Sequence, residues 1–169
     1  MEIRMLQVDD LSAYRVIRRQ ALVNHPEAFG MSVAEFDAQD DESASTGLTS
    51  GLPQTGMLGA FVDGDLVGTI SARRHHRTKT RHRANIGAMY VSPSVRGQGI
   101  GRQLMQAALD HFRSLGDIEQ VVLAVTAGNI AARNLYRRMG FITWGVDPAY
   151  IRVGDVDHDI EWMILWLTD

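Results

Sequence analysis

The chain has 169 residues, of which 45% are hydrophobic and 22% charged, so its composition is that of one folded domain rather than a disordered chain. It has no apolar run near the ~20 residues of a membrane-spanning helix, no secretory signal pattern at its start, and no cysteine for disulfides, iron–sulfur clusters or nucleophilic catalysis. We therefore expect a single cytoplasmic domain over residues 1–169, with no membrane partner.

The net charge of −3 hides a strongly cationic middle of the chain. Residues 1–68 carry 4 basic and 11 acidic side chains, residues 69–115 carry 9 and 1, and residues 116–169 carry 4 and 8. The three segments thus have charges of −7, +8 and −4. A phosphate-bearing ligand would be attracted to the middle segment and a cationic substrate to the flanks.

Apolar spacing and turn signals predict a mixed α/β order, βααβββαβαββ, with one central sheet and helices on its faces. A typical hairpin turn, Asp63-Gly64-Asp65, separates two of the strands. The predicted elements are a strand at 2–8, helices at 10–24 and 32–46, strands at 57–63, 66–73 and 84–92, a helix at 99–115, a strand at 119–126, a helix at 130–139, and strands at 141–146 and 159–167.

A glycine-rich turn joins the strand at 84–92 to the helix that follows it. Three glycines in five residues, Gly97, Gly99 and Gly101, allow positive φ angles and a close approach of the backbone to a ligand. The helix then begins with unpaired N–H groups and a positive dipole end, which suits a pyrophosphate. Arg96 and Arg102 add positive charge beside it. A tight turn whose glycines serve only packing is the alternative.

Two common phosphate-binding motifs do not match this turn. A Walker A loop ends in Gly-Lys-Ser or Gly-Lys-Thr, which the segment lacks. A dinucleotide-binding fingerprint would place its third glycine at position 102, where Arg102 stands, and Glu119 precedes its strand instead of following it.

The motif Arg96-x-x-Gly99-x-Gly101 on a strand–helix turn resembles the acetyl-CoA pyrophosphate loop of the GNAT superfamily of N-acetyltransferases. A second block, Asn129-x4-Asn134-Leu135-Tyr136-x3-Gly140-Phe141, resembles the helix and strand that follow in that family, at a similar spacing. The resemblance covers about residues 84–144, and Pro26–Gly30 and Lys79–His82 are similar to a bacterial subgroup of unassigned substrate. It implies a mostly antiparallel, twisted central sheet with helices on both faces.

The resemblance also implies which residues hold the cosubstrate acetyl-CoA. Main-chain groups of the strand before the loop would pair with the pantetheine arm, loop amides would hold the pyrophosphate, and the asparagine that opens the next helix would contact the cofactor. The matching residues are Met89, Tyr90 and Val91 on the strand, Arg96, Gly97, Gln98, Gly99, Ile100, Gly101 and Arg102 on the loop, and Asn129 and, more weakly, Asn134 on the helix.

Tyr136 matches the family tyrosine near the thioester sulfur. Because a phenol has a pKa of about 10 and a thiol about 8.5, complete proton transfer to the leaving thiolate would be uphill by roughly 2 kcal/mol. We therefore predict that Tyr136 hydrogen-bonds the developing thiolate and donates its proton fully only if the site shifts these pKa values. Its helical spacing with Ala132, Leu135 and Met139 is also compatible with a purely structural role in the core.

The general base is missing from the matched pattern. Many family members carry a glutamate on a central strand, but Ala124 stands five residues before Asn129, and residues 85–88 offer no carboxylate. Water, Glu35 or His82 are the remaining candidates, and an amine of low pKa would need no strong base.

The segment 73–83, RRHHRTKTRHR, has six Lys or Arg and three His in eleven positions. No aromatic residue interleaves these charges, so we expect a solvated turn that attracts anionic CoA rather than a nucleic-acid partner. A metal site from His75, His76 and His82 would lack a partner acid, and we predict no bound metal.

Both faces of the last strand become apolar toward the chain end, as in a central strand or in an edge completed by a second subunit of a homodimer. The acids Asp155, Asp157 and Asp159 precede this strand, where they would face a cationic acceptor or form a plain acidic turn.

We expect an acetyl-CoA-dependent N-acetyltransferase that acetylates a primary amine of a small molecule or peptide by direct attack. A non-catalytic acyl-CoA-binding module and an RNA-associated protein acting through residues 73–83 are the alternatives.

Overall fold

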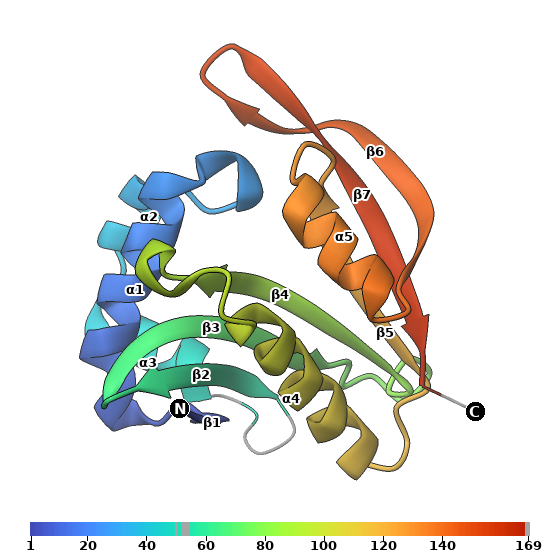
Figure 1. The fold of residues 1–169 in the computed structure, drawn as a ribbon, viewed down its shortest axis with the longest axis horizontal. Helices are drawn as coiled ribbons and strands as arrows, with labels where there is room; N and C mark the ends of the chain where they lie inside the picture. Colours follow the sequence, from blue (N-terminus) through green and yellow to red (C-terminus); the bar gives the residue numbers. More distant parts are fainter. Residues whose placement is uncertain (50, 52–54, 168–169) are drawn as a thin grey trace.

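The computed structural model describes residues 1–49, 51 and 55–167, and its centre is one seven-stranded sheet (Figure 1). The strand order across the sheet is β1-β2-β3-β4-β5-β7-β6. The strands are β1 (Glu2–Met5), β2 (Gly56–Val62), β3 (Asp65–Arg74), β4 (Arg83–Val91), β5 (Gln120–Thr126), β6 (Ile142–Val153) and β7 (Val156–Trp166). The α-helices are α1 (Leu11–Asn24), α2 (Val33–Asp37), α3 (Asp41–Thr49), α4 (Ile100–Ser114) and α5 (Ile130–Arg138), with short 3-10 helices η1 (Val8–Asp10), η2 (Pro26–Ala28) and η3 (Pro93–Val95).

Five of the six strand pairs are antiparallel, and β4 with β5 is the parallel pair. This confirms the predicted mixed, mostly antiparallel sheet, and the predicted element order holds except for one additional helix before β2. The parallel pair follows from the chain path, because a parallel connection needs a long crossover and α4 provides it.

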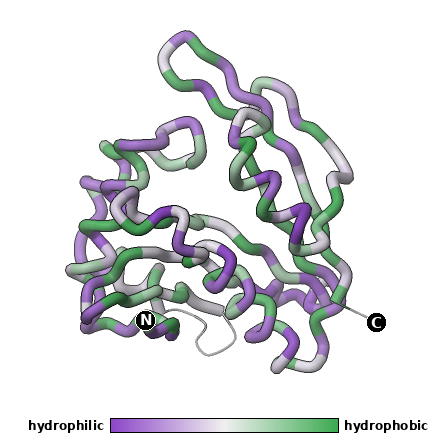
Figure 2. The backbone as a smooth tube through the Cα atoms, in the orientation of Figure 1, coloured by the Kyte–Doolittle hydropathy of each residue, from purple (hydrophilic) through white to green (hydrophobic). Residues whose placement is uncertain are grey.

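Helices cover both faces of the sheet (Figure 1). Leu58 and Ala60 of β2 pack in the cluster that includes Leu104 and Phe112 of α4, whereas Met57 of β2 packs against Leu48 of α3 on the other face. In Figure 2, hydrophobic and hydrophilic residues alternate along α4, as expected for a helix with one face on a sheet. No helix within the described ranges is long and apolar enough to cross a membrane.

The helix predicted over 32–46 is two helices, α2 and α3. Ser32 caps α2 in a reciprocal arrangement with Glu35, and the Asp40 carboxylate accepts a hydrogen bond from the backbone N–H of Ser43. Each cap satisfies a free N–H at a helix start, so the second cap begins a new helix where we predicted a continuous one.

The last two strands are longer than predicted and form a hairpin that projects from the body of the molecule (Figure 1). Val153 pairs with Val156 across a two-residue turn in which Gly154 has a φ of 59°. The polar residues of this region obscured the strand pattern, although Gly154-Asp155 is a recognisable turn signal. At the other end of the chain, β1 ends at Met5, not at the predicted residue 8.

The feature that positions the site is a separation of β4 from β5. Their parallel pairing extends from Arg83 with Gln120 to Ile86 with Leu123, although both strands continue beyond those residues. At the same point the register between β3 and β4 shifts, and Ala88 adopts a φ of 47°. A bulge of this kind increases the local twist, so β4 stays paired with β3 but diverges from β5, and the main-chain groups on its β5 side have no partner strand.

Candidate active site

A cavity of about 880 Å³ lies at this separation, between the ends of β4, α4 and α5. The turn from β4 into α4 forms one wall of the cavity. The opposite wall is formed by the first residues of α5, which are exposed, and by the buried side of that helix. The residues that line it are His25, Ala28, Phe29, Met89, Tyr90, Val91, Val95, Arg96, Gly97, Gly99, Ile100, Gly101, Arg102, Gln106, Leu109, Arg113, Asn129, Ala131, Ala132, Leu135, Tyr136, Arg138 and Met139.

The start of α4 presents backbone N–H groups to this cavity. Gly97 and Gly99 both have a φ of 80°, and Gly99 is the N-cap, so no side chain caps the helix. The first helical bond runs from Gln103 N–H to the Gly99 carbonyl, which leaves the preceding amides of α4 for a ligand. A Cβ at Gly97 would meet no atom within 4 Å, so the turn borders open space. These are the features of an anion site.

The charges of the cavity wall are of one sign. Arg96, Arg102, Arg113 and Arg138 line it, and no Asp or Glu is found among the lining residues that the structure describes. Arg113 forms an exposed ion pair with Asp110, which leaves the excess positive. With the dipole of α4, this arrangement favours a ligand with several negative charges.

The structure brings together most of the residues predicted to hold the cofactor. Met89, Tyr90, Val91, Arg96, Gly97, Gly99, Ile100, Gly101, Arg102 and Asn129 line the cavity with Tyr136, whereas Gln98 and Asn134 do not line it. Asn134 is exposed on α5. The Asn129 side chain caps α5 by accepting the backbone N–H of Ala132 at 3.1 Å, and its amide nitrogen is left for a ligand.

Arg96 does more than supply charge. Its Nε donates to the Val91 carbonyl at 3.0 Å and its Nη2 donates to Nε2 of His25 at 3.0 Å. Its guanidinium also lies 5.7 Å from the ring centre of Tyr90. Arg96 therefore holds the loop against β4 and the end of α1, a contact that sequence spacing gave no means of finding.

Tyr136 lies on the buried side of α5 and points toward β4. Its hydroxyl donates to Sδ of Met89 at 3.5 Å, and its ring packs 6.1 Å from that of Phe141. Burial raises the pKa of the Tyr136 phenol to about 12. A phenol of this kind keeps its proton and acts as a hydrogen-bond donor at neutral pH.

Sequence analysis missed one buried carboxylate near this helix, that of Glu161 on β7. It accepts hydrogen bonds from Thr143 and from Arg137 and is paired with Arg133, so two cations of α5 face it. Burial opposes its ionisation, but these hydrogen bonds and charges together hold the pKa of Glu161 below its ordinary value. The signal was a single acid in an apolar strand opposite two arginines spaced i, i+4.

Neither sequence candidate for a general base lies in the cavity wall. Glu35 belongs to the α2 cap, where hydrogen bonds from the Ser32 backbone and hydroxyl lower its pKa, and His82 lies in the turn between β3 and β4. His25 does line the cavity, but its Nε2 already accepts from Arg96. Glu161 is engaged with α5.

The two charged segments outside the cavity, residues 73–83 and 155–159, form turns and adjoining strand ends of the sheet. The basic segment 73–83 forms the β3–β4 turn, where Arg74 pairs with Asp117, and its three histidines join no cluster of metal-ligating side chains within the described ranges. Of the acids predicted to precede the last strand, Asp157 and Asp159 lie within β7: Asp157 pairs with Arg152, and Asp159 accepts the Ala149 N–H at 2.8 Å. Both therefore serve the hairpin.

The fold as a whole superposes on those of solved GNAT acetyltransferases. A GNAT-family acetyltransferase from Streptococcus pneumoniae superposes with a TM-score of 0.84 over 99% of both chains at 19% identity. The yncA protein of Salmonella typhimurium, solved with its cofactor acetyl-CoA, superposes with a TM-score of 0.80 over 100% of this chain and 95% of that one at 22% identity. These likenesses confirm the expected fold.

The chain belongs to the acetyltransferase (GNAT) family, whose model matches residues 20–141. A mycothiol acetyltransferase from Thermobispora bispora is 33% identical over 151 residues, which cover 85% of this chain and 46% of that one. Another from Cellulomonas flavigena is 31% identical over 147 residues, 83% of this chain and 40% of that one. The chain thus spans less than half the length of these relatives.

Proposed function

We propose that the protein is an acetyl-CoA-dependent N-acetyltransferase that acetylates a primary amine of a small molecule or peptide. The observation that carries this proposal is one cavity that joins the uncapped start of α4, four arginines and the Tyr136 hydroxyl. Family membership and relatives named as acetyltransferases support it.

The residues present fit acetyl-CoA. The amides at the start of α4, with Arg102 and Arg138, would hold its phosphates, and the stretch of β4 after Ile86, which has no pairing on its β5 side, would hydrogen-bond its extended arm. Bound acetyl-CoA would supply an activated thioester.

Tyr136 would serve the leaving group. A thiolate that develops near its hydroxyl would accept the hydrogen bond that Met89 accepts in this structure. Because the pKa of Tyr136 is about 12, the phenol stabilises this thiolate by donating a hydrogen bond and keeps its proton.

The described residues of the cavity wall hold no free base, and this bears on the kind of amine that the protein would acetylate. No lining residue within the described part of the chain is a carboxylate, and Arg96 occupies Nε2 of His25. An amine with a substantial neutral fraction near pH 7 to 8, such as an α-amino group with a pKa of about 7.7–8.0, can react without a strong base, whereas a lysine side chain with a pKa near 10.4 cannot.

Isothermal titration calorimetry with CoA and acetyl-CoA, followed by a thiol-release assay with amines of graded pKa, tests the proposal. We expect binding, turnover that favours low-pKa amines, and a Tyr136→Phe variant that loses at least tenfold in kcat while its CoA affinity changes less than threefold. The absence of any binding heat from folded protein would contradict it.

A non-catalytic acyl-CoA-binding module is the second candidate, and the carboxylate-free cavity wall favours it. Tight CoA binding without thiol release for any amine in the panel would select this candidate.

A further inference from the structure

Arg18 is the arginine of α1 that no acid neutralises within the described part of the chain. The two other arginines of α1 each have a partner, Asp41 for Arg15 and Asp37 for Arg19. By contrast, Arg18 is partly buried, and its Nη1 is buried without a hydrogen-bond partner. Burial also lowers the pKa of its guanidinium. Because an unpaired cation away from water destabilises a fold, a ligand that brings an anion would stabilise this site.

The surroundings of Arg18 are aromatic and cationic. Its guanidinium lies 4.5 Å from the ring centre of Phe29, and Phe29 lines the cavity. Tyr14 precedes Arg18 by one helical turn on the same face of α1. Burial raises the pKa of the Tyr14 phenol, and the positive charges of Arg18 and of Arg73 on β3 oppose this rise. Two cations thus lie near a hydroxyl that keeps its proton, a set of groups that suits a carboxylate.

The face of the sheet on the α1 side is open to solvent where β4 and β5 separate. Ile86 and Leu123, the last paired residues, pack in the cluster under α4, so Gly87 and Ala124 face the opposite side. Ala124 is exposed, and a Cβ on Gly87 would meet the Ser71 hydroxyl oxygen at 3.3 Å and no other atom within 4 Å. A ligand can therefore approach the separation from the side opposite to α4.

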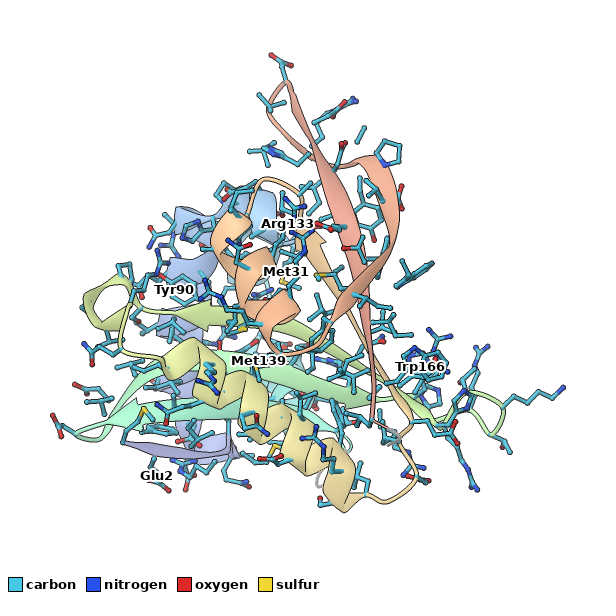
Figure 3. All side chains as sticks on the ribbon, turned by 45° about the vertical axis from the view of Figure 1, so that its right-hand side comes forward. Glu2, Met31, Tyr90, Arg133, Met139 and Trp166 are labelled. Atoms are coloured by element: carbon cyan, nitrogen blue, oxygen red, sulfur yellow. The ribbon has the colours of Figure 1, made fainter. Side chains whose placement is uncertain are left out.

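This side of the sheet leads to the cavity. Tyr90 marks the end of β4 in Figure 3, and Asn24 of α1 donates to its hydroxyl at 3.2 Å, so α1 lies against that end. His25 and Phe29, which follow α1, line the cavity. Arg18 precedes His25 by seven residues, about 10 Å along the helix, a length that about three extended peptide residues span. An acceptor on this side would present its amine to the thioester with its far end at Arg18.

We propose that Arg18, with Tyr14 and Arg73, binds a carboxylate of the acceptor, and that the acceptor is an amine with a distant carboxylate, such as a short peptide with a free C-terminus. This inference rests on the proposed function, because acetyl transfer defines the acceptor. The phosphates of CoA would have their own cationic site on the other side of the sheet, at the start of α4 with Arg102 and Arg138. Arg18 is thereby left for the anion of the acceptor.

Triglycine and its C-terminal amide test the inference, since they share the α-amino group and differ in the carboxylate. In a thiol-release assay we expect the KM of the free acid to be about tenfold below that of the amide. Arg18→Gln should raise the KM of the acid by about tenfold, and it should change the KM of the amide and the Kd of CoA by less than about threefold. The same comparison with diglycine and tetraglycine measures the span between the carboxylate site and the thioester.

Arg19→Gln is the matched control, because it removes an equal charge from the exposed side of α1, where Arg19 pairs with Asp37. It should leave both KM values unchanged within about threefold. Arg18→Gln should keep the melting temperature of the unmodified protein, since it removes a cation that has no ion pair among the described residues. Equal melting temperatures separate a loss of binding from a loss of folding.

Calorimetry with the CoA complex gives a second readout that needs no turnover. N-acetyltriglycine, the expected product, should bind about tenfold more tightly than its amide, and Arg18→Gln should remove this difference. Equal affinities, or no binding of the acid to the unmodified protein, would overturn the inference. A tenfold loss of CoA affinity in Arg18→Gln would overturn it as well, by assigning Arg18 to the cofactor.

The two proposals fail in different ways. Peptides that are acetylated equally well with and without the carboxylate would keep the acetyltransferase activity and contradict the role of Arg18. Acid-selective binding of N-acetyltriglycine without turnover of any amine would contradict the activity and keep Arg18 as a carboxylate site.

Discussion

The hydroxyl of Tyr136 on α5 donates a hydrogen bond to Sδ of Met89 on β4, across the region where β4 has left β5. The donor–acceptor distance is 3.5 Å, and the Tyr136 ring is buried against Phe141. A thioether sulfur is a weak acceptor, so this contact holds the phenol in place without competing strongly with a better acceptor. Under the proposed function, this pair is where the thioester sulfur would be recognised.

Tyr136 should make the protein less stable in strong alkali. Between pH 10 and pH 12 the unfolded chain releases the Tyr136 proton while the folded chain, with a pKa of about 12, retains it. The free energy of unfolding therefore falls as pH rises, by about 2 kcal/mol at pH 12. Urea unfolding from pH 9 to pH 12 should show this loss.

Tyr136→Phe is the control for this titration, because it removes the ionisable group and keeps the ring. The difference in unfolding free energy between the two proteins isolates Tyr136 from Tyr14, whose pKa burial also raises. Parallel pH curves for the two proteins would contradict the prediction.

Glu161 should stabilise α5 through its buried carboxylate. Glu161→Gln leaves Arg133 and Arg137 without their anion, and we expect a loss of about 2 to 3 kcal/mol because Arg137 remains half-exposed to water. The unmodified protein should lose this contribution as pH falls below about 4.5, since the folded pKa is lowered and acid protonates the carboxylate.

Thermal denaturation of both proteins from pH 3.5 to pH 7 measures this effect. Asp37→Asn is the matched control, because it breaks the exposed ion pair with Arg19 and should leave the melting temperature nearly unchanged. Equal effects of the two substitutions would refute a special role for Glu161.

Gly99→Ala should separate the conformational and the binding roles of the glycine turn. An alanine at a φ of 80° costs about 1 kcal/mol of stability, and its methyl group faces the cavity with only the Gln103 side chain within 4 Å. We expect CoA affinity to fall at least tenfold in calorimetry.

Gly116→Ala at the far end of α4 provides the comparison. Gly116 has a φ of 76°, has open space around it and does not line the cavity. It should lose similar stability and keep CoA affinity. If both variants bind CoA equally well, the amides at the start of α4 are not the phosphate site.

Arg102→Gln should weaken CoA binding about tenfold and reduce its dependence on salt, because one cation leaves a cavity wall that carries no acid in the described residues. Arg19→Gln on α1 removes an equal charge outside the cavity. Calorimetry at 50 and 300 mM salt compares the two, and an equal loss in both variants would indicate a general effect of net charge.

Sequence patterns within single segments predicted most of the helices, the strands and the position of the cavity, because interactions between neighbouring residues largely determine these features. The spacing of Gly97, Gly99 and Gly101 predicted an anion site at a helix start, and the cavity is found there. The division of the helix at 32–46 depended on the Asp40 cap, which competes with helix continuation by a small margin. Contacts between distant segments arise from packing: that of Arg96 with His25 has no local signal, and that of Glu161 with α5 has only the single acid in an apolar strand.

The separation of β4 from β5 gives the sheet an inner edge in addition to its two outer edges. An unpaired edge strand at the periphery of a sheet can pair with a strand from another chain. Here the inner edge of β4 lines the cavity beside α4 and α5, where an extended ligand can lie along it. Unpaired peptide groups of the kind that promote aggregation at an outer edge thereby become a binding site for an extended ligand.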